Sequence, residues 1–231
     1  MDWVVQIIGG KFVLEELSKS LKLSELCVFQ KGQAFFLKCD DFNRAINAKD
    51  VFEQAKRILP ILSGATRLEL GQPLELGNVF RLNDDGTLQE FGFGWGEYTL
   101  PKFFMRGSGT GAQVSNIADN VNVWFKTAQK DDNATEALSL FGSIELNWVI
   151  LYKIFETIKA DIKTKIYKKG WSTKTVEERF TRTAQPHRHS KHSEKMQKWK
   201  PHDKPMRFEE AVASIRTILD NWLRSKVKEG I

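Results

Sequence analysis

The sequence predicts an α+β fold, in which a mixed domain of sheet and helix is followed by an all-helical bundle. Two observations carry this prediction. Up to residue 130, short apolar runs alternate with turn residues, as β-strands do. After that point, apolar residues recur at the three- and four-residue spacing of long amphipathic helices. We therefore expect an α+β domain over residues 1–130 and a helical domain over residues 131–231.

Strands and one helix are expected in the first domain. Turn signals such as Lys31-Gly32 and Asp40-Asp41 end the early apolar runs. Asn83-Asp84-Asp85-Gly86 predicts a hairpin turn, because Asp-Gly tolerates the positive φ angles that such turns require. Helical spacing of apolar residues from Asp50 to Leu62 predicts a helix that packs on the sheet. The expected strands are Trp3–Ile8, Glu25–Phe29, Ala34–Cys39, Val79–Leu82 and Leu88–Phe93.

Three helices are expected in the second domain. Asn133 and Glu136 have the spacing of an N-cap and its capping-box partner, and an apolar stripe then continues to Ile162, which predicts one core helix. We expect Pro186 to end a second, shorter helix, because proline lacks the N–H that a helix interior requires. The last helix starts near Pro205, so a loop should join the last two helices.

The composition excludes several classes of protein. With 231 residues, 41% of them hydrophobic, the chain can bury a sizeable core. No apolar run approaches the roughly 20 residues that cross a bilayer, so we expect a cytoplasmic protein with no membrane partner. Cys27 and Cys39 are too few for a disulfide framework and are expected to be free thiols. The glycines of Gly92–Gly96 and Gly107–Gly111 lack the Gly-Lys-Ser or Gly-Lys-Thr of a phosphate-binding loop, so no cofactor is expected.

All four histidines lie in one basic stretch near the C-terminus. From Arg179 to Arg207 the chain carries nine Lys or Arg residues against two acidic residues, which favours binding to polyanions. Trp199, between two lysines, offers a surface on which a base can stack. The candidate nucleic-acid-binding residues are Arg188, Lys191, His192, Lys198, Trp199 and Lys200.

A spaced pair of residues gives this stretch its resemblance to a known family. Arg182 precedes His187 by four intervening residues and His189 by six, at the end of one helix, and a final helix then opens with Phe208-Glu209-Glu210-Ala211. Over residues 133–228 this arrangement resembles the HEPN superfamily of small helical domains. The resemblance implies metal-independent cleavage of RNA by a homodimer, with Arg182 and either His187 or His189 as catalytic residues, in prokaryotic toxin–antitoxin or phage-defence systems.

The chemistry that the resemblance implies suits these residue types. A histidine would take the proton of the ribose 2′-hydroxyl or protonate the leaving oxygen, and Arg182 would stabilise the charged phosphorane. The first domain would then sense a trigger or bind a protein partner.

Other interpretations of the same stretch remain open. His187, His189 and His192 have a spacing that a metal ion accepts, but no cysteine lies nearby, so no metal site is expected. The loop can also bind nucleic acid without cleaving it, and the helical domain can be a non-enzymatic dimerisation or interaction module. On the first helix of this domain, Trp148 and Tyr152 are expected in the core. The carboxylates of Glu145, Glu156 and Asp161 are expected to solvate this helix, with orientation of a basic residue across the bundle as the alternative for Glu156.

Overall fold

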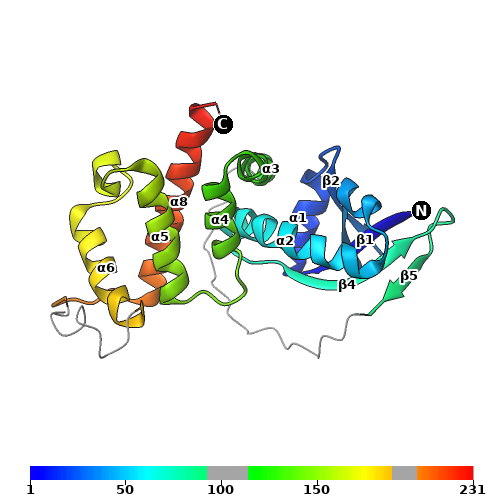
Figure 1. The fold of residues 1–231 in the computed structure, drawn as a ribbon, viewed down its shortest axis with the longest axis horizontal. Coiled ribbons are helices and arrows are strands. Elements are labelled where there is room, and N and C mark those ends of the chain that lie inside the picture. The colour runs from blue at the N-terminus through cyan, green and yellow to red at the C-terminus, as the bar shows by residue number, and fades with distance from the viewer. Residues whose placement is uncertain (93–113, 189–201, 231) are drawn as a thin grey trace. The chain divides into compact units, whose positions relative to one another are not determined.

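The first part of the chain folds into a five-stranded antiparallel sheet with two helices (Figure 1). The computed structural model describes residues 1–92, 114–188 and 202–230, and of residues 114–119 the backbone only. The sheet has the strand order β2-β3-β1-β4-β5, and without β5 it is a split β-α-β arrangement. The elements are β1 (Asp2–Ile8), α1 (Lys11–Ser20), β2 (Leu26–Lys31), β3 (Ala34–Cys39), the 3-10 helix η1 (Asp40–Arg44), α2 (Ala48–Leu70), β4 (Glu75–Leu82) and β5 (Leu88–Phe91).

Beyond β5, the residues that the structure describes form helices joined by short connections, which confirms the predicted α+β fold class. The chain divides into two units, Met1–Phe125 and Lys126–Ile231, and the helix α3 crosses the division. No helix was expected where α3 lies. In the part of the chain that the structure describes, no helix is long and apolar enough to cross a membrane. The helices from this point on are α3 (Val114–Lys130), α4 (Asp132–Phe141), α5 (Trp148–Ile162), the 3-10 helix η2 (Ile166–Lys169), α6 (Lys174–Arg188) and α8 (Phe208–Lys228).

A row of aliphatic side chains across the sheet forms the core of the first unit. Val28, Leu37, Val5 and Val79 are neighbours in the strand register, and each is at most 2% exposed. The helix α2 packs against β1 and β4, and α1 packs against β2. Each such side chain contributes roughly 1.5–3 kcal/mol when it is fully buried. A shift of one residue in any strand would move its member of this row to the other face of the sheet, so burial of the row fixes the register.

The two helices of the first unit differ from expectation. The helix predicted from Asp50 to Leu62 runs from Ala48 to Leu70. It begins where the Asn47 side chain accepts a hydrogen bond from the Asp50 N–H at 3.0 Å, and it ends at Gly71, whose φ of 79° only glycine adopts at low cost. The helix α1 was missed because it is short, and its apolar face follows directly on a turn signal.

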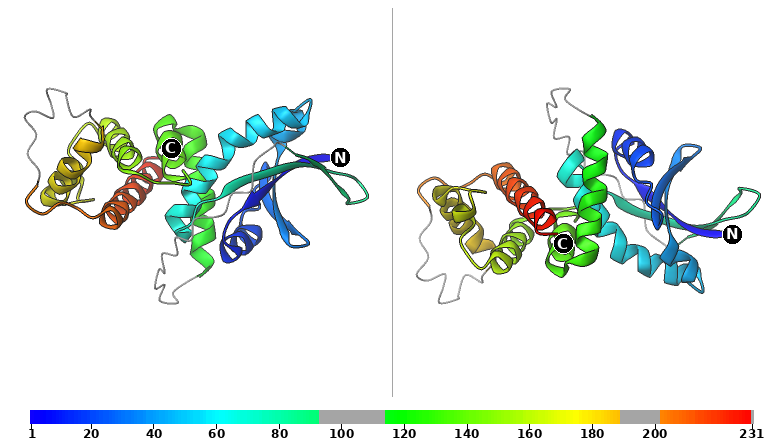
Figure 2. Two further views of the ribbon diagram at one scale, coloured as in Figure 1. Left: turned by 90° about the horizontal axis from the view of Figure 1, so that it is seen from below. Right: turned by 90° about the horizontal axis from the view of Figure 1, so that it is seen from above.

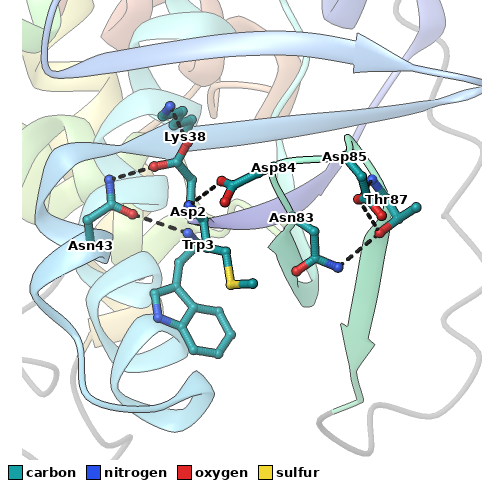
Figure 3. A network of polar contacts seen from close by, with 9 residues as sticks. Asp2, Trp3, Lys38, Asn43, Asn83, Asp84, Asp85 and Thr87 are labelled. Carbon is teal, nitrogen blue, oxygen red and sulfur yellow. Dashed lines mark hydrogen bonds and ion pairs between the residues drawn. The ribbon is translucent and has the colours of Figure 1, made fainter.

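Polar contacts fasten the N-terminal strand to the hairpin between β4 and β5 (Figure 3). The N-terminal amine of Met1 donates a hydrogen bond to Asp84 at 2.8 Å, and Lys38 donates one to Asp2 at 2.7 Å. The hydrogen bond from Lys38 is the main cause that lowers the pKa of Asp2.

Gly86 has a φ of 80°, and Asp85 accepts a hydrogen bond from the Thr87 N–H at 2.8 Å. The hairpin turn predicted at residues 83–86 is therefore confirmed.

The prediction of one core helix from Asn133 to Ile162 is wrong. The structure has two helices, α4 and α5, and each has its own N-cap: Asp131 accepts from the Ala134 N–H at 2.8 Å, and Asn147 accepts from the Ile150 N–H at 3.0 Å. Asn133 lies inside α4, and its side chain donates to Asp161 at 2.9 Å. The apolar stripe continues across both helices because both pack into the same core, so periodicity alone did not reveal the break.

The prediction that Pro186 ends its helix is also wrong. The helix α6 continues to Arg188, with Pro186 inside it. The missing N–H of a proline and the clash of its ring with the preceding turn weaken a helix interior, but they do not end α6 at this position. His187 is therefore a helical residue rather than part of a loop.

The second unit packs around α5, which contacts α4, α6 and α8 (Figures 1 and 2). A buried ion pair joins three of its helix segments. Lys226 Nζ lies 2.6 Å from Asp131 Oδ2 and 3.0 Å from Asp161 Oδ2, and the Lys226 side chain is 5% exposed. Asp161 also accepts a hydrogen bond from the indole N–H of Trp222 at 2.8 Å. This network links the start of α4, the end of α5 and the end of α8.

Candidate nucleic-acid interface

Aromatic rings from α5, α6 and α8 meet at one end of the second unit. Trp148, the first residue of α5, lies parallel to the ring of His187, with 5.5 Å between ring centroids and 13° between ring planes. The ring of Phe208 meets Trp148 edge to face at 5.6 Å. Trp148 is partly buried and His187 is exposed. The His187 imidazole is therefore the outermost ring of a stack whose inner part belongs to the core.

Arg188 extends this cluster along α5. Its guanidinium lies over the ring of Tyr152, 3.8 Å from the centroid, and donates a hydrogen bond to Glu156 at 2.8 Å. Glu156 was expected mainly to solvate its helix, and its hydrogen bond with Arg188 is the alternative that the sequence left open. Tyr152 also lies parallel to Phe180, with 6.0 Å between ring centroids. Burial, followed by the charge of Glu156, raises the pKa of Tyr152. We call Trp148, Tyr152, Glu156, His187 and Arg188 the aromatic–basic cluster.

Trp148 and Tyr152 were expected to be core residues. Each is only partly buried: one side of the ring packs in the core, and the other side faces a polar side chain of α6. The sequence carried a signal for this: Trp148, Tyr152 and Glu156 recur every four residues, so they follow one side of α5. What the sequence did not show is that the end of α6 stays helical and lies opposite this stripe.

Arg182 and His187 both lie on α6 and both are exposed. Five positions in an α-helix of 3.6 residues per turn correspond to a rotation of about 140°. Residues three or four apart are neighbours on a helix surface, whereas residues five apart point to different sides. A single copy of α6 therefore places this arginine and this histidine on different sides of the helix.

Several of the expected site residues lie outside the part of the chain that the structure describes. These residues are His189, Lys191, His192, Lys198, Trp199 and Lys200. Among the described residues, no three His, Cys, Asp or Glu side chains converge on a position that suits a metal ion. The fourth histidine, His202, lies just before α8. Its Nδ1 accepts a hydrogen bond from the backbone N–H of Lys204 at 3.0 Å.

The charge of the protein is concentrated in the second unit. Residues 126–231 contain 22 Lys and Arg against 14 Asp and Glu, a formal charge of +8. Residues 1–125 contain 13 against 15, a formal charge of −2. The aromatic–basic cluster thus belongs to the unit that attracts anions, and an electrostatic partner of the opposite sign would approach this unit first.

The comparisons with known proteins give no match. No protein-family model matches the sequence, and neither a curated protein nor a solved structure shows significant similarity to it. The resemblance of the helical unit to the HEPN superfamily therefore stays a prediction. Function must be argued from the geometry and charge of the second unit.

Proposed function

We propose that the protein is an RNA-directed module whose helical unit binds RNA at the aromatic–basic cluster. The observation that supports this proposal best is the stack of the exposed His187 on Trp148 with the Arg188 guanidinium next to it. An exposed ring with a rigid ring behind it is a surface on which an unpaired base can stack. The neighbouring guanidinium supplies donors in the fork geometry that matches a phosphate.

The charge of the unit supports the same proposal. Phosphate contacts supply most of the affinity of a protein for nucleic acid, and a unit of formal charge +8 attracts such a chain. Charge alone does not distinguish single-stranded from double-stranded nucleic acid. The cluster adds this selectivity, because an unpaired base can stack on it whereas the bases of a duplex are already stacked on one another. The partner proposed here is therefore RNA with unpaired bases.

Cleavage of that RNA is a second candidate function. It is favoured by the exposure of both Arg182 and His187 on the last turns of α6. In this form of the proposal the protein is a homodimeric, metal-independent ribonuclease of a prokaryotic toxin or phage-defence system. His187 of one copy transfers a proton at the ribose, and Arg182 of the other copy stabilises the charged phosphate. The first unit then binds a protein partner or senses a trigger.

Binding is tested by fluorescence anisotropy with a labelled, unstructured RNA 12-mer. We expect Trp148→Ala to weaken binding by roughly 5- to 150-fold, which corresponds to the 1–3 kcal/mol of one base stack. Arg188→Gln weakens binding too, whereas Lys153→Gln, which removes a charge from an exposed position on α5, has a small effect. Trp148→Phe keeps an aromatic ring at this position. If it binds RNA nearly as well as wild type, the loss of affinity in Trp148→Ala is due to the missing ring. Equal affinity of all these variants would overturn the proposal.

Cleavage is tested separately, in EDTA, on total RNA and tRNA. Arg182→Ala and His187→Ala should each abolish cleavage, with His189→Ala as the alternative for the histidine. If two copies complete one site, a mixture of Arg182→Ala and His187→Ala proteins regains roughly a quarter of the wild-type rate, because half of the dimers are mixed and each has one intact site. Cutting that survives in every variant, or no cutting by folded wild-type protein, rejects cleavage and leaves binding standing.

A further inference from the structure

A second group of basic side chains surrounds a cavity at the other end of the α5–α6 pair. The cavity has a volume of about 230 Å³ and lies between α5, η2 and α6. Lys159, Lys165 and Lys174 line it, together with Tyr167 and Thr181. All three lysines are exposed, so their ammonium groups reach the cavity from the solvent side. The aromatic–basic cluster does not include this cavity.

The acidic residues of the cavity leave these lysines in excess. Glu177 is 8% exposed, and its carboxylate accepts a hydrogen bond from the Tyr167 N–H, so it serves the turn before α6. Glu178 lies 3.9 Å from Lys174 across the surface of α6. Among the residues that the structure describes, neither the Lys159 nor the Lys165 ammonium has a hydrogen bond or an ion pair of 4 Å or less. The charges of both lysines favour the ionised form of Glu177, so three lysines against two glutamates leave the cavity with one positive charge in excess for an anion.

The cavity and the aromatic–basic cluster lie on one side of α5. Trp148, Tyr152, Phe155 and Lys159 follow one another at intervals of four, three and four residues, which is the repeat of a single helix face. At 1.5 Å per residue, Trp148 and Lys159 are about 16 Å apart along the helix axis, a distance that a single strand of several nucleotides can span. Arg188 and Lys174 are 14 residues apart on α6, which is close to four full turns.

We propose that the cavity lined by Lys159, Lys165 and Lys174 binds a phosphate of the same single RNA strand whose base stacks at Trp148 and His187. This inference rests on the proposed function. It defines the ligand as an unpaired stretch of several nucleotides that runs along the α5–α6 face. Its bases are held at one end and its backbone at the other, and a duplex fits this arrangement poorly because its bases cannot reach the stack.

The salt dependence of binding tests this inference. For single strands the logarithm of the binding constant falls with the logarithm of the salt concentration, with a slope of about −0.7 for each phosphate that the protein neutralises. Because the cavity binds one phosphate, we expect the Lys159→Gln/Lys165→Gln variant to make the slope less steep by about 0.7, and Lys159→Gln alone by no more than this. Lys153→Gln, on the same helix, is the matched control and leaves the slope unchanged. Trp148→Ala lowers affinity at every salt concentration without changing the slope.

The length of the RNA gives an independent measurement. Wild-type affinity should rise sharply between a 3-mer and a 6-mer, and Lys159→Gln should remove most of that rise. If Trp148→Ala weakens binding while Lys159→Gln changes neither the slope nor the length dependence, this inference is overturned and the proposed function stands. If the wild-type protein binds none of these RNAs, the proposed function fails, and this inference fails with it.

Discussion

The imidazole of His187 lies flat against the indole of Trp148, with 13° between the two ring planes. Because the His187 side chain is exposed and Trp148 is partly buried, the helix bundle holds the inner ring in place while the outer ring faces solvent. A surface ring with this support does not need to be ordered when a base stacks on it, which lowers the entropic cost of binding.

A substitution at His187 can separate RNA binding from RNA cleavage. His187→Phe keeps a ring on Trp148 but has no nitrogen that can transfer a proton. We expect it to bind the RNA 12-mer within about twofold of wild type and to be inactive in cleavage, whereas His187→Ala loses both, with a stacking loss of about 1–3 kcal/mol. Anisotropy and the EDTA cleavage assay on the same preparations check this. Weak binding by His187→Phe would show that the imidazole contributes a hydrogen bond rather than a stacking surface.

Glu156 limits the affinity of the cluster for an anion. It accepts a hydrogen bond from Arg188 at 2.8 Å and carries a negative charge next to the proposed phosphate position. Two unit charges about 6 Å apart in water repel by about 0.7 kcal/mol, so Glu156→Gln should tighten RNA binding by about threefold. The exposed ion pair itself contributes at most about 1 kcal/mol to stability. Weaker binding by Glu156→Gln would instead make Glu156 a residue that positions Arg188.

Local patterns in the sequence predicted most of the first unit. The apolar run of Ala34–Cys39, ended by Asp40-Asp41, and the Asp-Gly signal at Gly86 were sufficient to predict a strand and a hairpin turn, because both depend on neighbouring residues. What failed depends on tertiary context. The apolar stripe from α4 to α5 does not reveal that Asn147 starts a new helix, because both helices bury the same face in one core.

The candidate site could be predicted only in part. Residue types alone identified Arg182, His187 and Arg188, and the charge of their surroundings indicated a polyanion. The stack of His187 on Trp148 was not predictable, because the two residues are far apart in the sequence and meet only if α6 continues past Pro186. The rule that proline ends a helix does not hold for α6, which contains Pro186 and continues to Arg188.

The buried position of Lys226 makes it the most sensitive charged residue of the second unit. Hydrogen bonds from Lys226 and from the Trp222 indole outweigh burial and lower the pKa of Asp161. Lys226→Met leaves Asp131 and Asp161 without their cation, and we expect it to lower the free energy of unfolding by about 3–5 kcal/mol. Arg224→Ala, which breaks the more exposed pair with Asp220 on the same helix, should cost no more than about 1 kcal/mol. Denaturant unfolding measures both, and equal losses would contradict the buried role of Lys226.

The start of α5 tests the division into two helices. Asn147→Ala removes the side chain that accepts from the Ile150 N–H, and we expect a loss of about 1 kcal/mol, whereas Asn147→Asp retains the cap. A loss of this size lowers the melting temperature by roughly 2–4 °C in a protein of this length. If Asn147→Ala has the same melting temperature as the wild-type protein, the stability of α5 does not depend on this cap.

Glu177 makes the stability of the second unit dependent on pH. Burial raises the pKa of Glu177 above that of an exposed glutamate, and the hydrogen bond from the Tyr167 N–H only partly opposes this. When the folded pKa is the higher one, the native state binds more protons than the unfolded state at pH values between the two. The free energy of unfolding therefore falls as the pH rises from the unfolded value, about 4.3, through the folded value.

Glu177→Gln removes this dependence, because glutamine is neutral at every pH and its carbonyl oxygen still accepts from the Tyr167 N–H. We expect the variant to match wild type below about pH 4 and to be more stable at pH 7, with the gap opening through the titration of Glu177. Urea unfolding at pH values from 4 to 8 measures this gap. Glu178→Gln, at the next and exposed position, is the control and should show no such gap. Parallel curves for wild type and Glu177→Gln would mean that the carboxylate is as well solvated in the folded protein as in the unfolded chain.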